Sequence, residues 1–210
     1  MDNRTKDIIE TFDAWAVKGK DKGMEEGHAS SVSRMIDIVQ SSDFISKTSF
    51  SALDLGCGNG WMARKIKEIP NCESVIGVDG ADSMIENAKN IDPSGNYIVR
   101  DINNWTPNNK INLVISMEVF YYLDDPKNML LKIYNQFLDS PGMIVIGIDH
   151  YKENIPSLEW PSQLNLDLRT LSENNWKVLL TEAGFNRVES ETTPSNRDWN
   201  GTLILTGFKD

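Results

Sequence analysis

The stretch from Ser51 to Ile66, SALDLGCGNGWMARKI, constrains the fold of this chain most strongly. It opens with a short apolar run that contains one carboxylate, Asp54, and three glycines follow at alternate positions, Gly56, Gly58 and Gly60. Apolar residues then recur at helical spacing. This order predicts a buried strand, a glycine turn and a helix. Because glycine lacks a Cβ and adopts positive φ readily, a ligand could contact the backbone of this turn.

The spacing of the glycines separates this turn from two common nucleotide-binding turns. It is Gly-x-Gly-x-Gly, whereas the dinucleotide fingerprint has two residues before its third glycine. No Gly-Lys-Ser/Thr follows, which disfavours a phosphate-binding P-loop. Asp54 would repel a pyrophosphate but could attract a cation or orient the turn. A strand-to-helix turn that binds no ligand is the alternative interpretation.

The segment Leu53 to Gly60, LDLGCGNG, resembles motif I of the class I S-adenosylmethionine-dependent methyltransferases of small-molecule type. The resemblance implies that S-adenosylmethionine is the cofactor and that Asp54 anchors its methionine part, often through water. It also implies that this part lies on the turn formed by Gly56, Cys57, Gly58, Asn59 and Gly60. The implied fold class is α/β, with a Rossmann-like, doubly wound, seven-stranded sheet. Such a sheet is mostly parallel with an antiparallel terminal strand, and a helical cap precedes it here.

Acidic residues end the next two predicted strands. Residues 74–78 are β-branched and apolar and lead to Asp79, and residues 96–100 lead to Asp101. A carboxylate at a strand end can accept two hydrogen bonds from a ribose diol. In the resembled family, Asp79 and Gly80 would contact the ribose, and Asp101 and the backbone of Ile102 would contact adenine. A helix start at Asp79 and an ordinary turn at Asp101 are the alternatives.

The fourth predicted strand, residues 111–117, is almost continuously apolar, as expected for a strand buried on both faces of a parallel sheet. The residues after it resemble the family motif beside the reacting methyl group, so Met117 and Glu118 are expected cofactor contacts. Tyr121 is a candidate pocket or catalytic residue, with core packing as its alternative. A helix is predicted from Pro126, because proline favours the first helical turn.

Residues 1–45 are predicted to form a helical cap over the sheet. Apolar stripes over residues 8–16 and 32–39 predict two helices, with a loop at residues 19–23 between them. Glu25 and His28 would share a helical face. Either side chain is a candidate to face the transferred methyl group or to bind substrate, and a structural or solvated histidine is the alternative. Two ligands are too few for a metal site, and we expect no metal.

The last third of the chain places a second histidine at the predicted site. A turn at residues 139–142 leads to a fifth strand, residues 143–148, whose carboxyl end carries His150 to the same sheet edge as the glycine turn. His150 is a candidate general base or a structural histidine. Residues 150–171 are too long for a simple connection and predict a lid or substrate loop. A helix capped by Ser172 and two strands, residues 187–193 and 201–208, complete a single domain over residues 1–210.

Length and charge limit the kinds of molecule that this chain is expected to bind. A length of 210 residues suits one α/β domain, and a formal net charge of −10 with a pI of about 4.7 disfavours a nucleic-acid or anionic-membrane surface. A small-molecule partner is expected. Cys57 and Cys72 are the only cysteines, and the chain starts without a signal core or spanning segment, so we expect a cytoplasmic protein. The sequence does not indicate an oligomeric state.

The resemblance implies an enzyme that transfers a methyl group from S-adenosylmethionine to a small acceptor by in-line displacement, chiefly by alignment of the reacting atoms. Two alternatives stay open. A non-catalytic S-adenosylmethionine-binding or scaffold protein would keep the motif but lack an adjoining substrate cavity. An NAD-dependent oxidoreductase would share Asp79 and the turn, but its pyrophosphate would face Asp54.

Overall fold

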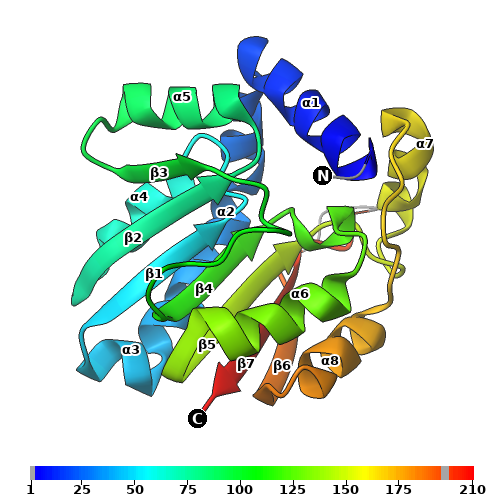
Figure 1. Ribbon diagram of the computed structural model, residues 1–210. Coiled ribbons are helices and arrows are strands. Elements are labelled where there is room, and N and C mark those ends of the chain that lie inside the picture. The colour runs from blue at the N-terminus through cyan, green and yellow to red at the C-terminus, as the bar shows by residue number, and fades with distance from the viewer. Residues whose placement is uncertain (1–2, 195–198) are drawn as a thin grey trace.

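The computed structural model describes residues 3–194 and 199–210 and contains a seven-stranded sheet in the order β3-β2-β1-β4-β5-β7-β6 (Figure 1). β1 to β5 are mutually parallel, whereas β7 is antiparallel to both β5 and β6. The predicted α/β sheet with an antiparallel ending is confirmed. The strands are β1 (Phe50–Leu55), β2 (Cys72–Asp79), β3 (Asn96–Val99), β4 (Ile111–Met117), β5 (Leu138–Ile148), β6 (Asn186–Thr192) and β7 (Leu203–Lys209).

The centre of the sheet is formed by β1 and β4, whose apolar residues are buried on both faces. Leu53 of β1 lies opposite Ile76 of β2 and Val114 of β4. Leu53 and Val114 are fully buried, as their position between two helical layers requires. Parallel strands end at one edge, so the carboxyl ends of β1 and β4 meet at the middle of that edge.

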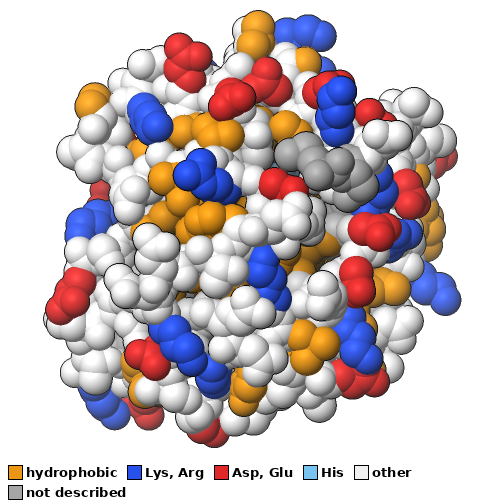
Figure 2. All heavy atoms as spheres, in the orientation of Figure 1, with side chains coloured by type: hydrophobic (Ala, Val, Ile, Leu, Met, Phe, Trp, Pro, Cys, Tyr) orange, Lys and Arg blue, Asp and Glu red, His pale blue; other side chains and the backbone are white. Residues whose placement is uncertain are grey.

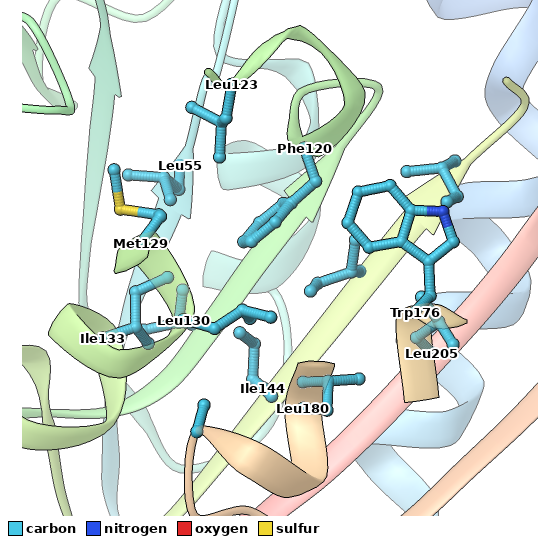
Figure 3. Close-up of a cluster of buried hydrophobic side chains, with 14 of the residues drawn as sticks. Leu55, Phe120, Leu123, Met129, Leu130, Ile133, Ile144, Trp176, Leu180 and Leu205 are labelled. Atoms are coloured by element: carbon cyan, nitrogen blue, oxygen red, sulfur yellow. The ribbon is translucent and has the colours of Figure 1, made fainter. Parts of the chain in front are cut away.

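Helices cover both faces of the sheet. α2, α3 and α4 pack on one face, and α6 and α8 pack on the other around a core that includes Phe120, Leu130 and Trp176 (Figure 3). Ser172 caps α8 as predicted, because its hydroxyl accepts a hydrogen bond of 3.2 Å from the Asn175 N–H. The helices that follow the first strand are α4 (Trp61–Lys67), α5 (Asp82–Ile91), α6 (Pro126–Lys132), α7 (Trp160–Leu164) and α8 (Glu173–Glu182).

The N-terminal segment is more helical than the sequence predicts. α1 (Asn3–Val17) and α2 (Lys20–Ser41) are separated only around Gly19, whose φ of 69° breaks the helix. The predicted loop at residues 19–23 is therefore wrong beyond Gly19. A helix tolerates an exposed glycine when a long flanking stretch packs well, and α2 buries Val32 and Met35 against the sheet. A short α3 (Asp43–Lys47) follows, and residues 1–2 of the predicted cap lie outside the described residues.

β5 begins five residues earlier than predicted. β4 pairs Ile111 with Leu138 and Leu113 with Met143, so two residues of β4 correspond to five of β5. The predicted turn at residues 139–142 is therefore an irregularity inside β5 rather than a connection before it.

Two segments far apart in the sequence lie above the carboxyl ends of the parallel strands. Figure 1 shows α1 on one side of this edge and α7 on the other. The 150–171 connection contains a short 3-10 helix, η3 (Ile155–Glu159), and then α7. Another 3-10 turn, η1 (Phe120–Tyr122), follows β4 at the same edge. The edge is thus enclosed by cap, connection and turn.

The surface mixes charges of both signs. On the face drawn in Figure 2, acidic and basic side chains are interspersed, with hydrophobic side chains gathered between them in the upper half. Within the described part of the chain, no helix has both the length and the apolar character needed to cross a bilayer.

Candidate active site

Three adjoining cavities lie at the carboxyl ends of the strands, and all three are bordered by Met24 and Glu118. The long cavity, about 130 Å³, is lined by residues that include Ile9, Gly58, Asp79, Gly80, Asp101, Ile102 and Met117. The turn cavity, about 60 Å³, is lined by residues that include Asp21, Asp54, Gly56, Cys57, Asn59 and Met117. The aromatic cavity, about 380 Å³, is lined by Phe12, Trp15, Met24, His28, Glu118, Tyr121, Tyr122, Asp149, Trp160, Gln163, Leu164 and Trp199.

The glycine turn requires glycine at two positions for different reasons. Gly56 has a φ of 77°, and the side chain of Val119 occupies the space that a Cβ would need. Gly58 has a φ of 51° and borders both the long and the turn cavities, where a Cβ would make only an ordinary contact of 3.8 Å with the sulfur of Met84. The Gly58 N–H donates a hydrogen bond of 2.9 Å to Oδ2 of Asp79, which fixes the turn against β2.

The residues predicted to bind adenosine gather in the long cavity. Asp79 also accepts a 2.9 Å hydrogen bond from the Ala81 N–H at Oδ1. Burial raises the pKa of Asp79, and these backbone donors partly offset that rise. Asp101 is held by the Asn103 N–H at 3.0 Å, and Ile102 borders the same space. The structure brings these residues together, and their individual contacts with a nucleoside stay predictions.

The turn cavity holds two buried carboxylates besides Glu118. Asp54 is completely buried, and neither of its oxygens has a well-formed hydrogen bond from a described residue. Burial raises the pKa of Asp54 to about 8. Asp21 of α2, 5% exposed, accepts hydrogen bonds from the side-chain amides of Asn59 at 3.1 Å and Asn87 at 3.3 Å. A cation bound in this cavity would favour the ionised form of Asp54, because the carboxylate could then accept a charge-assisted hydrogen bond.

Glu118 lies where the cavities meet, directly after β4. Its φ of 60° is a left-handed conformation that costs energy in a residue with a side chain, and such strain is concentrated at functional sites. Oε2 accepts a 2.5 Å hydrogen bond from the Tyr121 hydroxyl, and Oε1 accepts one of 2.5 Å from the Asp149 N–H. Burial, and secondarily the charge of Asp149, hold the pKa of Glu118 well above its usual range.

His28 faces the aromatic cavity from α2. Its Nδ1 lies 3.5 Å from Oδ2 of Asp149, and burial lowers the pKa of His28 while the Asp149 charge acts in the opposite direction. His28, Glu118 and Asp149 each offer a ligand atom within 4.8 Å of the others. The sequence-based expectation of no metal considered only Glu25 and His28, so this trio, drawn from three distant segments, was not among its candidates.

Three other predicted residues lie away from the cavities. His150 is fully buried, and its two ring nitrogens bond the Ser157 carbonyl at 2.9 Å and the Thr170 hydroxyl at 2.7 Å. This packing ties the start of the 150–171 segment to its end. Gly60 has a φ of 76° and faces Tyr97, and Glu25 lines none of the three cavities.

Several site residues were missed by sequence reasoning. Asp21 and Met24 line the cavities together with His28 because helical spacing puts them on one face of α2, a pattern that the misplaced loop at residues 19–23 concealed. Asp149 and His150 were both expected at this sheet edge, but only the histidine was predicted to have a role. The meeting of Trp160 and Trp199, whose ring centroids lie 5.7 Å apart, has no local sequence signal.

A family model described as the methyltransferase domain matches residues 21–190. The chain belongs to the methyltransferase domain family. The predicted class I S-adenosylmethionine-dependent methyltransferase resemblance is thereby confirmed, together with its sheet.

Members of the methyltransferase domain family with curated names are similar to this chain over part of their length. Malonyl-[acyl-carrier protein] O-methyltransferase 1 of Ilyobacter polytropus is 29% identical over 67% of this chain and 58% of its own. Trans-aconitate 2-methyltransferase of Rhizobium etli is 26% identical over 65% of this chain and 50% of its own. The match thus spans little more than half the length of these curated relatives.

A solved structure is similar over nearly the whole chain. It is a chain from the complex between the Haloferax volcanii Trm112 methyltransferase activator and a methyltransferase. The TM-score is 0.82 at 26% identity, over 94% of this chain and 96% of that chain. The structural similarity therefore extends beyond the residues 21–190 that the family model matches.

Proposed function

We propose that the protein is an enzyme that transfers a methyl group from S-adenosylmethionine to a small-molecule acceptor. The observation that carries this proposal is the convergence of the long, turn and aromatic cavities on Met24 and Glu118. The first two adjoin the family's glycine turn, and the third, at about 380 Å³, has the volume of a small-ligand pocket. An adjoining acceptor cavity is the feature that a pure cofactor-binding scaffold would not need.

The chain's own residues fit the cofactor in parts. The carboxylates of Asp54 and Asp21 suit the ammonium of the methionine moiety, and the open Cβ position at Gly58 lets that moiety pass close to the backbone. Asp79 retains lone pairs for a ribose diol, and Asp101 borders the same cavity as a candidate adenine contact. S-adenosylmethionine supplies an electrophilic methyl group on its sulfonium. The positive charge of that group suits the acidic lining beside Glu118.

The contribution of the protein to the reaction is alignment and enclosure. An acceptor in the aromatic cavity would reach the methyl group at the border that this cavity shares with the turn cavity, and in-line displacement requires the acceptor atom, the methyl carbon and the sulfur to be aligned there. We propose that α1 acts as a cap and the 150–171 segment as a lid or substrate loop of a single methyltransferase domain. Trp160, Gln163 and Leu164 from that segment line the acceptor side. Their side chains would exclude water from the transfer.

Candidate roles around the acceptor follow from position. His28 is the proposed general base if the acceptor arrives protonated, because burial keeps its imidazole neutral. Tyr121 is proposed to hold Glu118 in place through its 2.5 Å hydrogen bond. We propose that the enzyme works in the cytoplasm, since its two cysteines, Cys57 and Cys72, are both free thiols.

The acceptor's charge is the open part of the proposal. The two curated relatives are named for malonyl-acyl-carrier protein and trans-aconitate, both of which are acids. If this protein acted on the same acids, its acceptor cavity would need cationic side chains, and none of the described lining residues is lysine or arginine.

Calorimetry with S-adenosylhomocysteine tests the cofactor assignment. The wild-type protein should bind it, and Asp79→Asn should weaken binding by about tenfold because one ribose acceptor is lost. Asp82→Asn, a change at the exposed first residue of α5, is the matched control and should bind like the wild type. Binding of NAD in place of S-adenosylhomocysteine would contradict the proposal, and cofactor binding without transfer to any acceptor would favour a scaffold.

A further inference from the structure

The walls of the aromatic cavity are built from six aromatic side chains that come from four separate segments. Phe12 and Trp15 of α1 lie 5.2 Å apart, measured between ring centroids, and Trp160 of α7 lies 6.4 Å from Tyr121. Trp199 stacks on Trp160. Tyr122 of η1 packs against both Phe12 and Tyr121 and so joins the aromatic rings of α1 to those of η1. Aromatic faces attract organic cations, and quaternary or protonated amines are bound in proteins by such walls.

The floor of the same cavity is acidic. Asp149 is 5% exposed, and its Oδ1 accepts no hydrogen bond from any described residue. Glu118, 9% exposed, lies beside it through the Asp149 N–H. None of the described residues that line the cavity is Lys or Arg. Lys20 lies 5.1 Å from the centroid of the Trp15 ring but is not part of the lining.

A buried carboxylate with an unused oxygen is costly unless a cation approaches it. An anionic acceptor would face two carboxyl groups and would find no lysine or arginine among the described lining residues to pair with. A neutral alcohol could donate only one hydrogen bond to this floor. A protonated amine offers up to three donors and a positive charge that suits both floor and walls.

We propose that the acceptor is an amine, bound as its ammonium ion by Asp149 and the aromatic walls and methylated on nitrogen. This assignment rests on the proposed methyltransferase function. In the reaction, His28 takes one proton from the ammonium and so frees the nitrogen lone pair. That pair forms the new bond to the methyl carbon as the carbon–sulfur bond breaks. The bonding pair leaves with sulfur, which gives S-adenosylhomocysteine and a methylated ammonium ion.

A divalent metal is the rival occupant of the His28, Glu118 and Asp149 trio. The hydrogen bonds of Glu118 favour the amine, since both of its oxygens already accept donors from the protein, at 2.5 Å each. These bonds hold the Glu118 carboxylate in place without a metal, although each oxygen keeps one lone pair, so chelation of metal ions by EDTA is needed to separate the two occupants. An ammonium ion can instead bond the unused Oδ1 of Asp149.

The test supplies acceptors by charge class rather than by name. A small-molecule extract of bacterial cells is separated by ion exchange into cationic, neutral and anionic fractions, and each is incubated with the protein and methyl-labelled S-adenosylmethionine. We expect labelled product from the cationic fraction alone, with the label on nitrogen. Label from only the neutral or anionic fraction would overturn the amine assignment and leave the methyltransferase function intact. Failure to bind S-adenosylhomocysteine by calorimetry would instead reject the proposed function itself.

Variants and a metal chelator sharpen the result. Asp149→Asn should lower transfer to the cationic fraction by about 30-fold or more, because a buried charge pair loses one partner, while S-adenosylhomocysteine affinity stays within about twofold. Asp139→Asn, the same change at an exposed position near the start of β5, is the matched control. Full activity of Asp149→Asn would overturn the proposal. So would loss of transfer in EDTA that Mg²⁺ or Mn²⁺ restores, since the trio would then be a metal site.

Discussion

The turn side and the aromatic side of this site are built in different ways. The turn side depends on the backbone of one short segment, with Gly56 and Gly58 at positive φ and the Gly58 N–H bonded to Asp79 at 2.9 Å, and α2 adds Asp21 to it. The aromatic side uses only side chains, which reach one space from α1, α2, the ends of β4 and β5, α7 and Trp199. A cofactor common to a family can be held by a local motif. An acceptor particular to one protein is recognised by residues that only the fold assembles.

The largest expected effect is a loss of cofactor affinity on the turn side, caused by Gly58→Val. The new side chain would enter the space that the long and turn cavities share, so S-adenosylhomocysteine affinity should fall by about 100-fold or more. The positive φ adds a stability cost of about 1–2 kcal/mol. Gly27→Val on an open face of α2 is the control, and it should bind normally. Unchanged affinity in Gly58→Val, measured by calorimetry, would remove the turn from the binding site.

The second prediction concerns proton linkage on the turn side. Because the pKa of Asp54 is raised to about 8, folding favours its protonated form, and the stability this gives at low pH is lost as pH rises towards that value. A bound ammonium favours the ionised form. Affinity for S-adenosylhomocysteine should therefore rise from about pH 6 to about pH 8, by up to about tenfold per unit, with proton release.

Calorimetry in buffers of different ionisation enthalpy measures that proton release directly. Asp54→Asn should show a flat profile over the same range, since it has no group to titrate. A wild-type profile that is equally flat would mean that Asp54 does not meet the ammonium.

The same difference explains which features could be predicted from the sequence: those of the turn side could, whereas most of those of the aromatic side could not. Alternating apolar strands and helices predicted the sheet and its antiparallel ending, and LDLGCGNG predicted the turn, since each signal lies within a few residues. The extent of α2 was missed because two glycines conceal a helix that tertiary packing stabilises. The approach of Asp149 to His28 joins residues 121 positions apart, and no local pattern encodes such a contact.

The third prediction tests the walls of the aromatic side. Trp160→Leu keeps an apolar surface but removes a ring, so the KM for a cationic acceptor should rise by about tenfold while kcat stays within about threefold. Trp105→Leu is the matched control, because Trp105 packs on Phe137 outside the three cavities. Steady-state kinetics with the labelled cofactor would show it. An equal rise in KM for both variants would trace the effect to stability rather than to the cavity.

The smallest effect on activity should come from His150→Gln, although His150 directly follows Asp149 in the sequence. Its ring nitrogens bond Ser157 and Thr170 inside the protein, so its loss should cost about 1–3 kcal/mol of stability and leave kcat within about twofold.

Burial lowers the pKa of His150, so the native state favours the neutral ring, and its contribution to stability is lost as pH falls below the ordinary histidine range. Denaturant unfolding of the variant should accordingly show a weaker fall in stability on acidification than the wild type. A large loss of kcat in a folded His150→Gln variant would instead indicate that His150 takes part in the reaction, as the predicted general base would. The acceptor side would then extend beneath the 150–171 segment rather than end at Asp149.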